Sequence, residues 1–146
     1  ARFLNPSEHI TVITPALKVG LELCNRNNVE VLQLGGMIRS NSSSVAGNFA
    51  EKILEEISCG IVFLGVDGID LDFGFSITNL AEAALDQKMI ETAQTVVILA
   101  DSTKFDKRGL GKVCTFEQVS YIITDDKVPE LVVQQLEEKG VKVIIA

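Results

Sequence analysis

Histidine is nearly absent from this sequence of 146 residues, and tryptophan is absent altogether. The one histidine, His9, lies close to the first residue, so a centre that needs an imidazole beside a serine or cysteine nucleophile is not expected. Cys24, Cys59 and Cys114 are odd in number and widely spaced, which fits neither a disulfide framework nor a zinc ligand set. We therefore predict no catalytic residues and no metal, and we interpret the three cysteines as small buried apolar side chains.

Long apolar runs and an excess of positive charge are also missing. No stretch approaches the roughly 20 apolar residues that cross a bilayer, and the first residues lack the pattern of a secretion signal. The formal net charge of −7 opposes binding to nucleic acid or anionic lipid, because such binding requires clustered lysine and arginine. We expect a cytoplasmic protein with no membrane contact, which on its own is a poor DNA binder.

Nucleotide-binding signatures are absent as well. The sequence contains no Walker loop, and Gly65, Gly68 and Gly74 are too loosely spaced for the G-x-G-x-x-G pattern of dinucleotide-binding proteins. We therefore predict that the chain binds no cofactor.

The sequence does contain a regular alternation of strand and helix patterns. Its length allows one core that buries roughly two thirds of the unfolded surface, and 47 % of its residues are hydrophobic. We predict strands at 10–14, 29–34, 61–70, 96–99, 121–124 and 141–145, with helices after Pro15, after Gly47, at 80–93 and at 128–139. This order predicts an α/β fold with a mostly parallel sheet covered by helices, in which strands 61–70 and 96–99 are buried on both faces.

Polar residues stand at the carboxyl ends of these two apolar strands. Asp67 lies between glycines in the first, and Asp101, Ser102 and Lys104 follow the second. Ligands of open α/β sheets bind beyond the carboxyl ends of the strands. We therefore expect Asp67 and Lys104 to face each other across a cleft for a small anionic metabolite, as hydroxyl acceptor and phosphate anchor respectively.

A glycine pair follows the predicted strand 29–34. Gly35 and Gly36 allow a sharp turn or the close approach of a ligand, and the polar run 39–44 then precedes Gly47 at the start of a helix. Because helix amino termini favour anions and Arg39 adds positive charge, this segment is a candidate wall of a phosphate site. The alternative is a solvated loop with a serine cap.

Each strand-end residue also has an ordinary structural explanation. Lys104 can pair with a neighbouring aspartate on the surface, Asp67 can be a turn residue, and Asp101 can cap the chain after its strand. The basic, glycine-containing segment 107–112 is interpreted as a mobile surface loop.

Seven motifs occur in an order and spacing that resemble the effector-binding domain of DeoR-family bacterial transcription regulators. They are LGG at 34–36, Gly47, FLGVDGID at 63–70, TNLAEA at 78–83, MIETA at 89–93, LADSTKF at 99–105 and IITD at 122–125. The resemblance covers nearly the whole chain. It implies a fold related to ribose-5-phosphate isomerase A and the CoA transferases, and a phosphorylated sugar or related metabolite as effector. The effector-binding residues that we predict are Gly35, Gly36, Arg39, Gly47, Asp67, Gly68, Asp101 and Lys104.

The resemblance also implies how the chain fits into a regulator. Residues 1–146 are expected to form a single, partial effector-binding domain. A winged helix-turn-helix that reads the operator, and a first strand with a Gly-Thr-Thr loop that supplies much of the phosphate cradle, are expected to precede Ala1. We expect a homo-oligomer, with Val132, Val133 and Leu136 as candidate contacts, whose packing and operator binding change when the effector binds.

The sequence departs from the family pattern at two places, and an enzyme remains an alternative. Thr14 and Pro15 stand where the family has Thr-Asn, and Asp86 and Gln87 replace a basic pair. A sugar-phosphate isomerase is the alternative function, since those relatives share the aspartate-containing strand end. However, Leu64 replaces one isomerase acid, so we hypothesise a pocket that keeps phosphosugar recognition without catalysis. A CoA-transferase-like subunit is a third possibility, but no convincing glutamate nucleophile is found.

Overall fold

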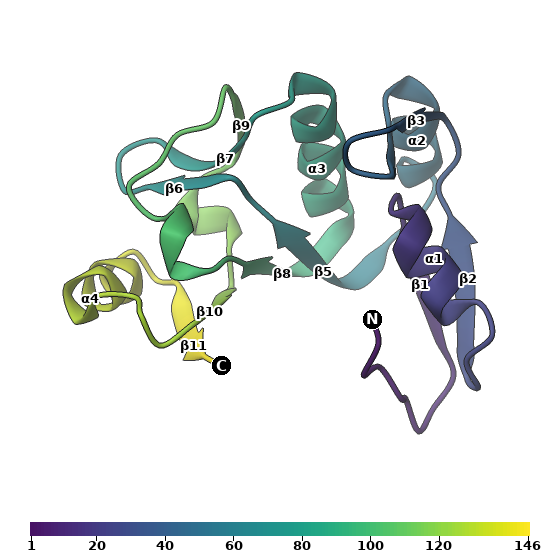
Figure 1. Cartoon of the computed structure of the whole chain (residues 1–146), viewed down its shortest axis with the longest axis horizontal. Helices are drawn as coiled ribbons and strands as arrows, with labels where there is room; N and C mark the ends of the chain where they lie inside the picture. Colours follow the sequence, from purple (N-terminus) through teal and green to yellow (C-terminus); the bar gives the residue numbers. More distant parts are fainter. The chain divides into compact units, whose positions relative to one another are not determined.

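The computed structural model describes residues 1–146, which divide into two compact units, Ala1–Ile53 and Leu54–Ala146. We describe each unit by itself (Figure 1). In the first, β1 (Ile10–Thr14) pairs in parallel with β2 (Val29–Gln33), and α1 (Leu17–Leu23) connects them. The two strands and the helix after Pro15 confirm the predicted β–α unit. Gly20 of α1 packs closely on β2, because a Cβ at this position would lie 2.3 Å from the side-chain oxygen of Gln33.

The polar run 39–44 lies at the tip of a β-hairpin that was not predicted, and its residues 40–43 form the largely exposed turn, in agreement with the solvated-loop alternative. β3 (Met37–Arg39) pairs antiparallel with β4 (Ser44–Ala46). The hairpin is attached to the end of β1, since Val45 donates its backbone N–H to the carbonyl of Pro15 at 2.9 Å. The run of serines concealed this element, because serine has little strand preference and only Val45 and Ala46 are buried.

A short helix follows the hairpin. α2 (Asn48–Leu54) begins after Gly47, as predicted, and Gly47 adopts a positive φ of 102° that favours glycine. Phe49 of this helix is exposed, and Ile57 lies beyond its end.

Four parallel strands form the main sheet of the second unit. They are β5 (Cys59–Gly65), β8 (Ala93–Leu99), β10 (Tyr121–Thr124) and β11 (Lys142–Ile145), in the spatial order β11-β10-β8-β5. α3 (Leu80–Thr92) connects β5 to β8, and α4 (Glu130–Glu138) connects β10 to β11. In Figure 1, α3 lies towards the β5 side of this sheet and α4 towards β11. The predicted α/β class with a parallel, helix-covered sheet is confirmed.

Helices cover only one face of this sheet. The strands are added in a single direction, and right-handed crossovers then place α3 and α4 on the same side. The buried core accordingly joins alternate residues of β5, β8 and β10 to both helices. On the opposite face Ile61, Phe63 and Leu99 are 49 %, 55 % and 43 % exposed. The prediction of burial on both faces is therefore wrong for β5, whereas in β8 Val96, Val97 and Ile98 are all buried and only Leu99 of the predicted strand 96–99 is exposed.

A second, smaller sheet follows β5. β6 (Gly68–Asp70), β7 (Gly74–Ile77) and β9 (Gly111–Cys114) form an antiparallel sheet in the order β6-β7-β9. The predicted single strand 61–70 is thus broken after Gly65, where the chain leaves the parallel sheet. The hairpin needs glycine at Gly74, which has φ 99° and whose Cβ would lie 2.4 Å from the carbonyl oxygen of Cys114.

The burial of individual side chains differs from two other expectations, one for the cysteines and one for α4. Cys24 is exposed and Cys59 is half-buried, so only Cys114 is the buried residue that we expected of all three. Leu136 is fully buried in the core, and Val132 and Val133 pack against that core. Leu136 is therefore not available as an oligomer contact, whereas Val132 and Val133 are half-buried and their role as contacts stays a prediction. No helix has the length and apolar character needed to span a membrane.

Candidate functional site

Three aspartates follow neighbouring strands at one edge of the parallel sheet. Leu99 of β8 lies beside Gly65 of β5 on one side and beside Ile123 of β10 on the other. Asp67, Asp101 and Asp125 come one or two residues after these strands end. The sheet topology therefore brings the two predicted strand ends to the same edge, and it adds a third.

Asp101 begins a single turn of 3-10 helix, η1 (Ser102–Lys104), that follows β8. Its carboxylate accepts the backbone N–H of Thr103 at 2.9 Å and also the Thr103 hydroxyl. These bonds from Thr103, aided by the charge of Lys104, lower the pKa of Asp101 below its usual value. Asp101 thus takes the capping role that we gave as its structural alternative, and it remains exposed to solvent.

Asp125 fixes the same turn from the next strand. Its Oδ2 accepts the backbone N–H of Ser102 at 2.9 Å, and its Oδ1 accepts that of Lys127 at 2.9 Å. The first of these bonds is the main cause of its lowered pKa. Sequence reasoning did not include Asp125 among the site residues, although its position directly after an apolar strand matches that of Asp101.

Lys104 ends the turn that these two aspartates hold. Its backbone N–H donates to the carbonyl of Asp101 at 3.0 Å, and the next residue, Phe105, is buried. The Lys104 side chain is half-buried and forms no ion pair. The surface pairing that we considered for this lysine is therefore not formed, and a positive charge stands beside the anchored turn.

Asp67 lies in the connection between β5 and β6. Its Oδ2 accepts the backbone N–H of Thr78 at 2.8 Å, and its own N–H donates to the carbonyl of Ser76 at 3.0 Å. The residue is exposed, whereas the adjacent Gly68 is buried, and a Cβ on Gly68 would lie 2.4 Å from the carbonyl oxygen of Lys107. Asp67 is therefore positioned by its turn, and Gly68 serves the packing of two chain segments.

The side of the site near α3 is acidic. Asn79 caps this helix, and its Oδ1 accepts the N–H groups of Ala81 and Glu82 at 3.0 and 3.1 Å. One turn further on, burial together with the charges of Glu82 and Asp67 raises the pKa of Asp86 to about 7. Asp86 thus provides a carboxyl group that is partly protonated near neutral pH.

The other predicted residues lie in the first unit. Gly35 and Gly36 connect β2 to the hairpin, and a Cβ on Gly35 would meet no atom within 4 Å. Gly36 has φ 143°, a value that favours glycine, and Arg39 ends β3 opposite Ser44. The predicted site therefore consists of two groups, Gly35, Gly36, Arg39 and Gly47 in the first unit, and Asp67, Gly68, Asp101 and Lys104 in the second.

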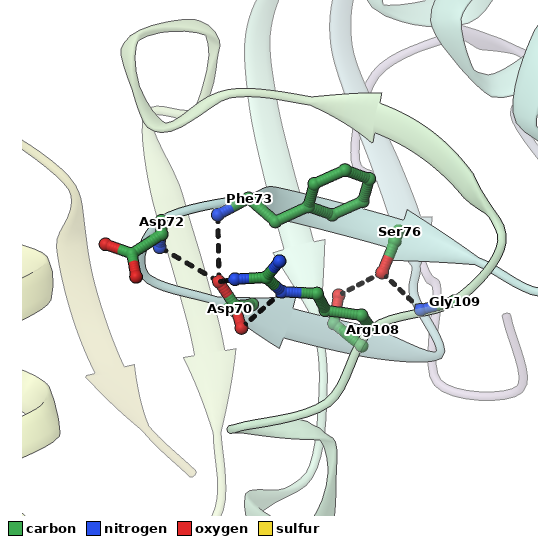
Figure 2. Close-up of polar contacts among 7 residues, drawn as sticks. Asp70, Asp72, Phe73, Ser76, Arg108 and Gly109 are labelled. Atoms are coloured by element: carbon green, nitrogen blue, oxygen red, sulfur yellow. Dashed lines mark hydrogen bonds and ion pairs between the residues drawn. The ribbon is translucent and has the colours of Figure 1, made fainter.

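The segment 107–112, expected to be a mobile loop, is fixed to the small sheet. Arg108 forms an ion pair with Asp70 at 2.6 Å, and the backbone N–H of Gly109 donates to the Ser76 hydroxyl at 2.8 Å (Figure 2). From Gly111 onwards the segment is strand β9. The glycines that suggested mobility instead permit close contact, since a Cβ on Gly109 would lie 2.6 Å from the backbone of Ile77.

Comparison with known proteins identifies the family. The sequence model described as "DeoR C terminal sensor domain" matches residues 1–126. This chain belongs to the DeoR family. The sensor domain is 36 % identical over 138 residues to the uncharacterized HTH-type transcriptional regulator YulB of Bacillus subtilis, covering 94 % of this chain and 54 % of YulB. It is 34 % identical to the putative aga operon transcriptional repressor of Escherichia coli O157:H7, covering 99 % of this chain and 54 % of that protein.

Activators as well as repressors occur among the relatives of this DeoR sensor domain. The L-fucose operon activator of Haemophilus influenzae is 24 % identical to it, over 98 % of this chain and 57 % of that protein. The chain spans about half the length of the curated relatives that it matches. Because the family consists of regulator sensor domains, its assignment confirms the resemblance found in the sequence and the prediction of a non-enzymatic domain.

Proposed function

We propose that this DeoR sensor domain binds a phosphorylated sugar or a related metabolite, and that binding controls a repressor of sugar metabolism. In this proposal the complete regulator is a cytoplasmic homo-oligomer that contacts its operator through a helix-turn-helix outside this chain. The effector changes the equilibrium between two arrangements of the oligomer by its difference in affinity for them.

One observation carries the proposal, namely the unpaired ammonium group of Lys104 on a turn that is held at both ends. Asp101 and Asp125 fix the start of this turn, and Phe105 is buried directly after it. A phosphate group is recognised best by donors that are already in place, because little conformational entropy is then lost on binding. We therefore assign Lys104 the role of phosphate anchor.

The charges around Asp67 suggest how the effector is oriented. Asp67, Glu82 and Asp86 interact electrostatically, and a dianionic phosphate beside them would be repelled. Carboxylates are good acceptors for sugar hydroxyl groups. We therefore place the phosphate at Lys104 and the sugar hydroxyls towards Asp67, with the exposed Asp101 beside the ligand and the buried Gly68 shaping the turn that carries Asp67.

The first unit carries further residues that we propose as effector-binding, and we consider them by themselves. A Cβ at Gly35 would contact no other atom, and Gly36 and Gly47 have backbone conformations that favour glycine. Backbone that is free of side chains lets a ligand approach its N–H groups directly. Arg39 is proposed to add positive charge. α2 contributes little, because a helix of seven residues has a weak dipole.

The names of two relatives support the choice of sugar-related ligands. The proteins from Escherichia coli and Haemophilus influenzae are named for the aga and L-fucose operons. A panel of sugar phosphates, the corresponding free sugars, inorganic phosphate and coenzyme A esters tests the proposal by thermal shift, followed by calorimetry. A sugar phosphate that stabilises the protein supports the proposal. Stabilisation by coenzyme A esters alone would contradict it.

Lys104→Met tests the phosphate anchor. Because a hydrogen bond from a charged donor contributes about 1.5 to 3 kcal/mol, the variant should weaken binding of the sugar phosphate roughly 10- to 100-fold. Lys127→Met is the matched control, since Lys127 is exposed, donates only its backbone N–H to Asp125, and its side chain acts on Asp125 by charge alone. Equal affinities of Lys104→Met and the wild type would remove Lys104 from the site.

An isomerase assay on the stabilising ligand separates the sensor from the alternative enzyme. The pKa of Asp86, raised to about 7, is suitable for a general base. Turnover of the ligand would therefore favour the isomerase. The proposal expects binding without turnover. Turnover that is abolished in Asp86→Asn would replace the sensor proposal by an enzymatic one.

A further inference from the structure

The segment that follows Lys104 is joined to the small sheet at three points. Phe105 forms a parallel bridge with Ile69 of β6, and Gly109 donates its N–H to the Ser76 hydroxyl of β7. Between them, Arg108 makes two hydrogen bonds to Asp70, from Nε to Oδ2 at 2.6 Å and from Nη2 to Oδ1 at 2.8 Å (Figure 2). The chain from residue 105 to residue 109 is thus attached along the whole edge of the β6–β7 hairpin.

Asp70 is already oriented before it meets Arg108. Its Oδ1 accepts the backbone N–H groups of Asp72 and Phe73, at 3.0 and 2.8 Å, within the hairpin turn. The bonds from Arg108 and Phe73 lower the pKa of Asp70 to about 2, so the carboxylate is charged at all ordinary pH values. Figure 2 shows this carboxylate between the turn amides and the guanidinium group.

Arg108 is oriented as well. Its guanidinium lies 5.4 Å from the centre of the Phe73 ring, within the range of a cation–π contact. A bidentate pair between arginine and a carboxylate fixes direction as well as distance, which a lysine at the same place cannot do. The Asp70–Arg108 pair is therefore suited to holding the position of the chain segment that carries it.

Lys104 lies directly between the two anchored parts. Before it, Asp101 and Asp125 hold the turn of η1, and after it, Phe105 and Arg108 attach the chain to the hairpin. Only Asp106 and Lys107 separate the buried Phe105 from Arg108, and Asp106 adopts a positive φ of 56°. This conformation, uncommon at a residue other than glycine, turns the chain sharply between the buried Phe105 and Arg108.

We propose that Asp70 and Arg108 are positioning residues that hold Lys104 in place for an anionic effector, without contacting the effector. The inference rests on the proposed function, in which Lys104 binds the phosphate group. It deepens that function, because it explains how a lysine on a loop keeps a fixed place beside the end of a strand.

Asp70→Asn separates this role from a simple effect of charge. The substitution removes a negative charge and leaves the positive charge of Arg108 unpaired, so a purely electrostatic effect would strengthen the binding of an anion. Positioning predicts the opposite, a roughly tenfold weaker affinity for the sugar phosphate. Arg108→Lys keeps the charge but loses the bidentate geometry, and it should weaken binding to a similar extent.

Asp72→Asn is the matched control in the same turn. It makes the same change of charge, but the Asp72 carboxylate is exposed, and the residue meets Asp70 only through its backbone N–H. Its affinity for the effector should stay within about twofold of the wild-type value, or increase slightly, since repulsion of the anion decreases. A tenfold loss in Asp72→Asn would show that charge in this turn, and not the pair, governs affinity.

A double-mutant cycle tests whether the pair acts through Lys104. If it does, Asp70→Asn should cost little further affinity in a protein that already carries Lys104→Met. Hydrogen exchange provides a readout that needs no ligand. The amide of Gly109, bonded to Ser76, should exchange about tenfold faster in Asp70→Asn than in the wild type or in Asp72→Asn.

The outcomes distinguish this inference from the proposed function. If the wild type binds a sugar phosphate and Lys104→Met weakens that binding, but Asp70→Asn does not, the positioning role is wrong and the proposed function stands. Additive losses in the double variant would show that the pair acts independently of Lys104, which also overturns the inference. If the wild type binds no phosphorylated sugar, the proposed function fails and the inference fails with it.

Discussion

Replacing Asp86 by asparagine should stabilise the protein at alkaline pH and change its stability little at acid pH. Asp86 lies on α3, where burial and the charges of Glu82 and Asp67 raise its pKa from 3.8 to about 7. The folded protein therefore holds this proton more tightly than the unfolded chain does. Asparagine has nearly the same size and never ionises, so it removes the cost of the buried charge.

The sign follows from proton linkage. Below pH 3.8 the Asp86 carboxyl is protonated in both states and has no net effect on the free energy of unfolding. As the pH rises from 3.8 to about 7, the unfolded chain releases this proton first, so the wild-type protein loses stability over that interval. Above pH 7 both states are ionised and the loss stays constant.

The size of the pKa shift of Asp86 sets an upper limit to the stability difference between Asp86→Asn and the wild type. A difference of about three pKa units corresponds to about 4 kcal/mol. Asp86 is half-buried, so solvent screens part of that cost, and we expect about 2 kcal/mol at pH 8. Urea denaturation followed by circular dichroism at pH 4, 6 and 8 measures the difference between Asp86→Asn and the wild type, which cancels the contributions of the other carboxylates.

Asp126→Asn is the control, because Asp126 is an exposed aspartate that follows β10. Its difference from the wild type should be small and nearly independent of pH. The reasoning about Asp86 would be refuted if Asp86→Asn differed from the wild type by the same amount at pH 4 and pH 8. It would equally be refuted if the variant were less stable than the wild type at pH 8.

Three further substitutions test the fold by urea denaturation. Phe75→Ala should lower the free energy of unfolding by about 3–5 kcal/mol, because this side chain is fully buried against Phe116. Phe63→Ala should lower it by only about 1 kcal/mol, because Phe63 is 55 % exposed. Equal losses in the two variants would contradict the described sheet faces. Gly74→Ala should lower the free energy of unfolding by more than about 1 kcal/mol, since φ is 99° and the new Cβ would clash with the Cys114 carbonyl. An unchanged stability would argue against the turn at Gly74. Asn79→Ala should cost about 1 kcal/mol by removing the cap of α3, while Asn79→Asp, which keeps the acceptor, should retain most of that stability.

The regular part of the fold could be predicted because its signals are local. Strand 96–99 is an apolar β-branched run, and the helix 80–93 has a capping asparagine before it, so both elements appear close to their expected bounds. The signal for the end of α4 is also local, because Gly140 follows the helix and adopts a positive φ of 86° that favours glycine. Local patterns of this kind do not depend on the partner against which an element packs.

The small sheet could not be predicted, because its strands depend on distant contacts. β6 and β9 are short, each begins with a glycine, and they become strands only because β7 lies between them. The IVFLGVDGID run looked continuous, and nothing in its letters marked the point after Gly65 where the chain changes sheets. In the same way, the segment 107–112 looked mobile because its partners, Asp70 and Ser76, are more than 30 residues away.

The position of the strand-end aspartates was predicted, but their hydrogen bonds were not, and their binding of an effector stays a prediction. Aspartates after apolar strands identified Asp67 and Asp101, and the sheet places both at one edge. Their hydrogen bonds to Thr78 and Thr103 depend on turn geometry that the residue types alone do not determine. Asp125 was missed because its role, holding Ser102, exists only once two strands lie side by side.

The open face of the β5–β8 sheet has a practical consequence for work with this chain. It places a strip of hydrocarbon, including Ile61 and Phe63, on a molecule whose net charge is −7. At low ionic strength, mutual repulsion keeps such molecules apart, whereas concentrated sulfate or phosphate both screens that repulsion and strengthens apolar contacts. Retention on a hydrophobic chromatography resin should therefore rise steeply with salt, and titrations with phosphorylated ligands should be carried out at constant, modest ionic strength.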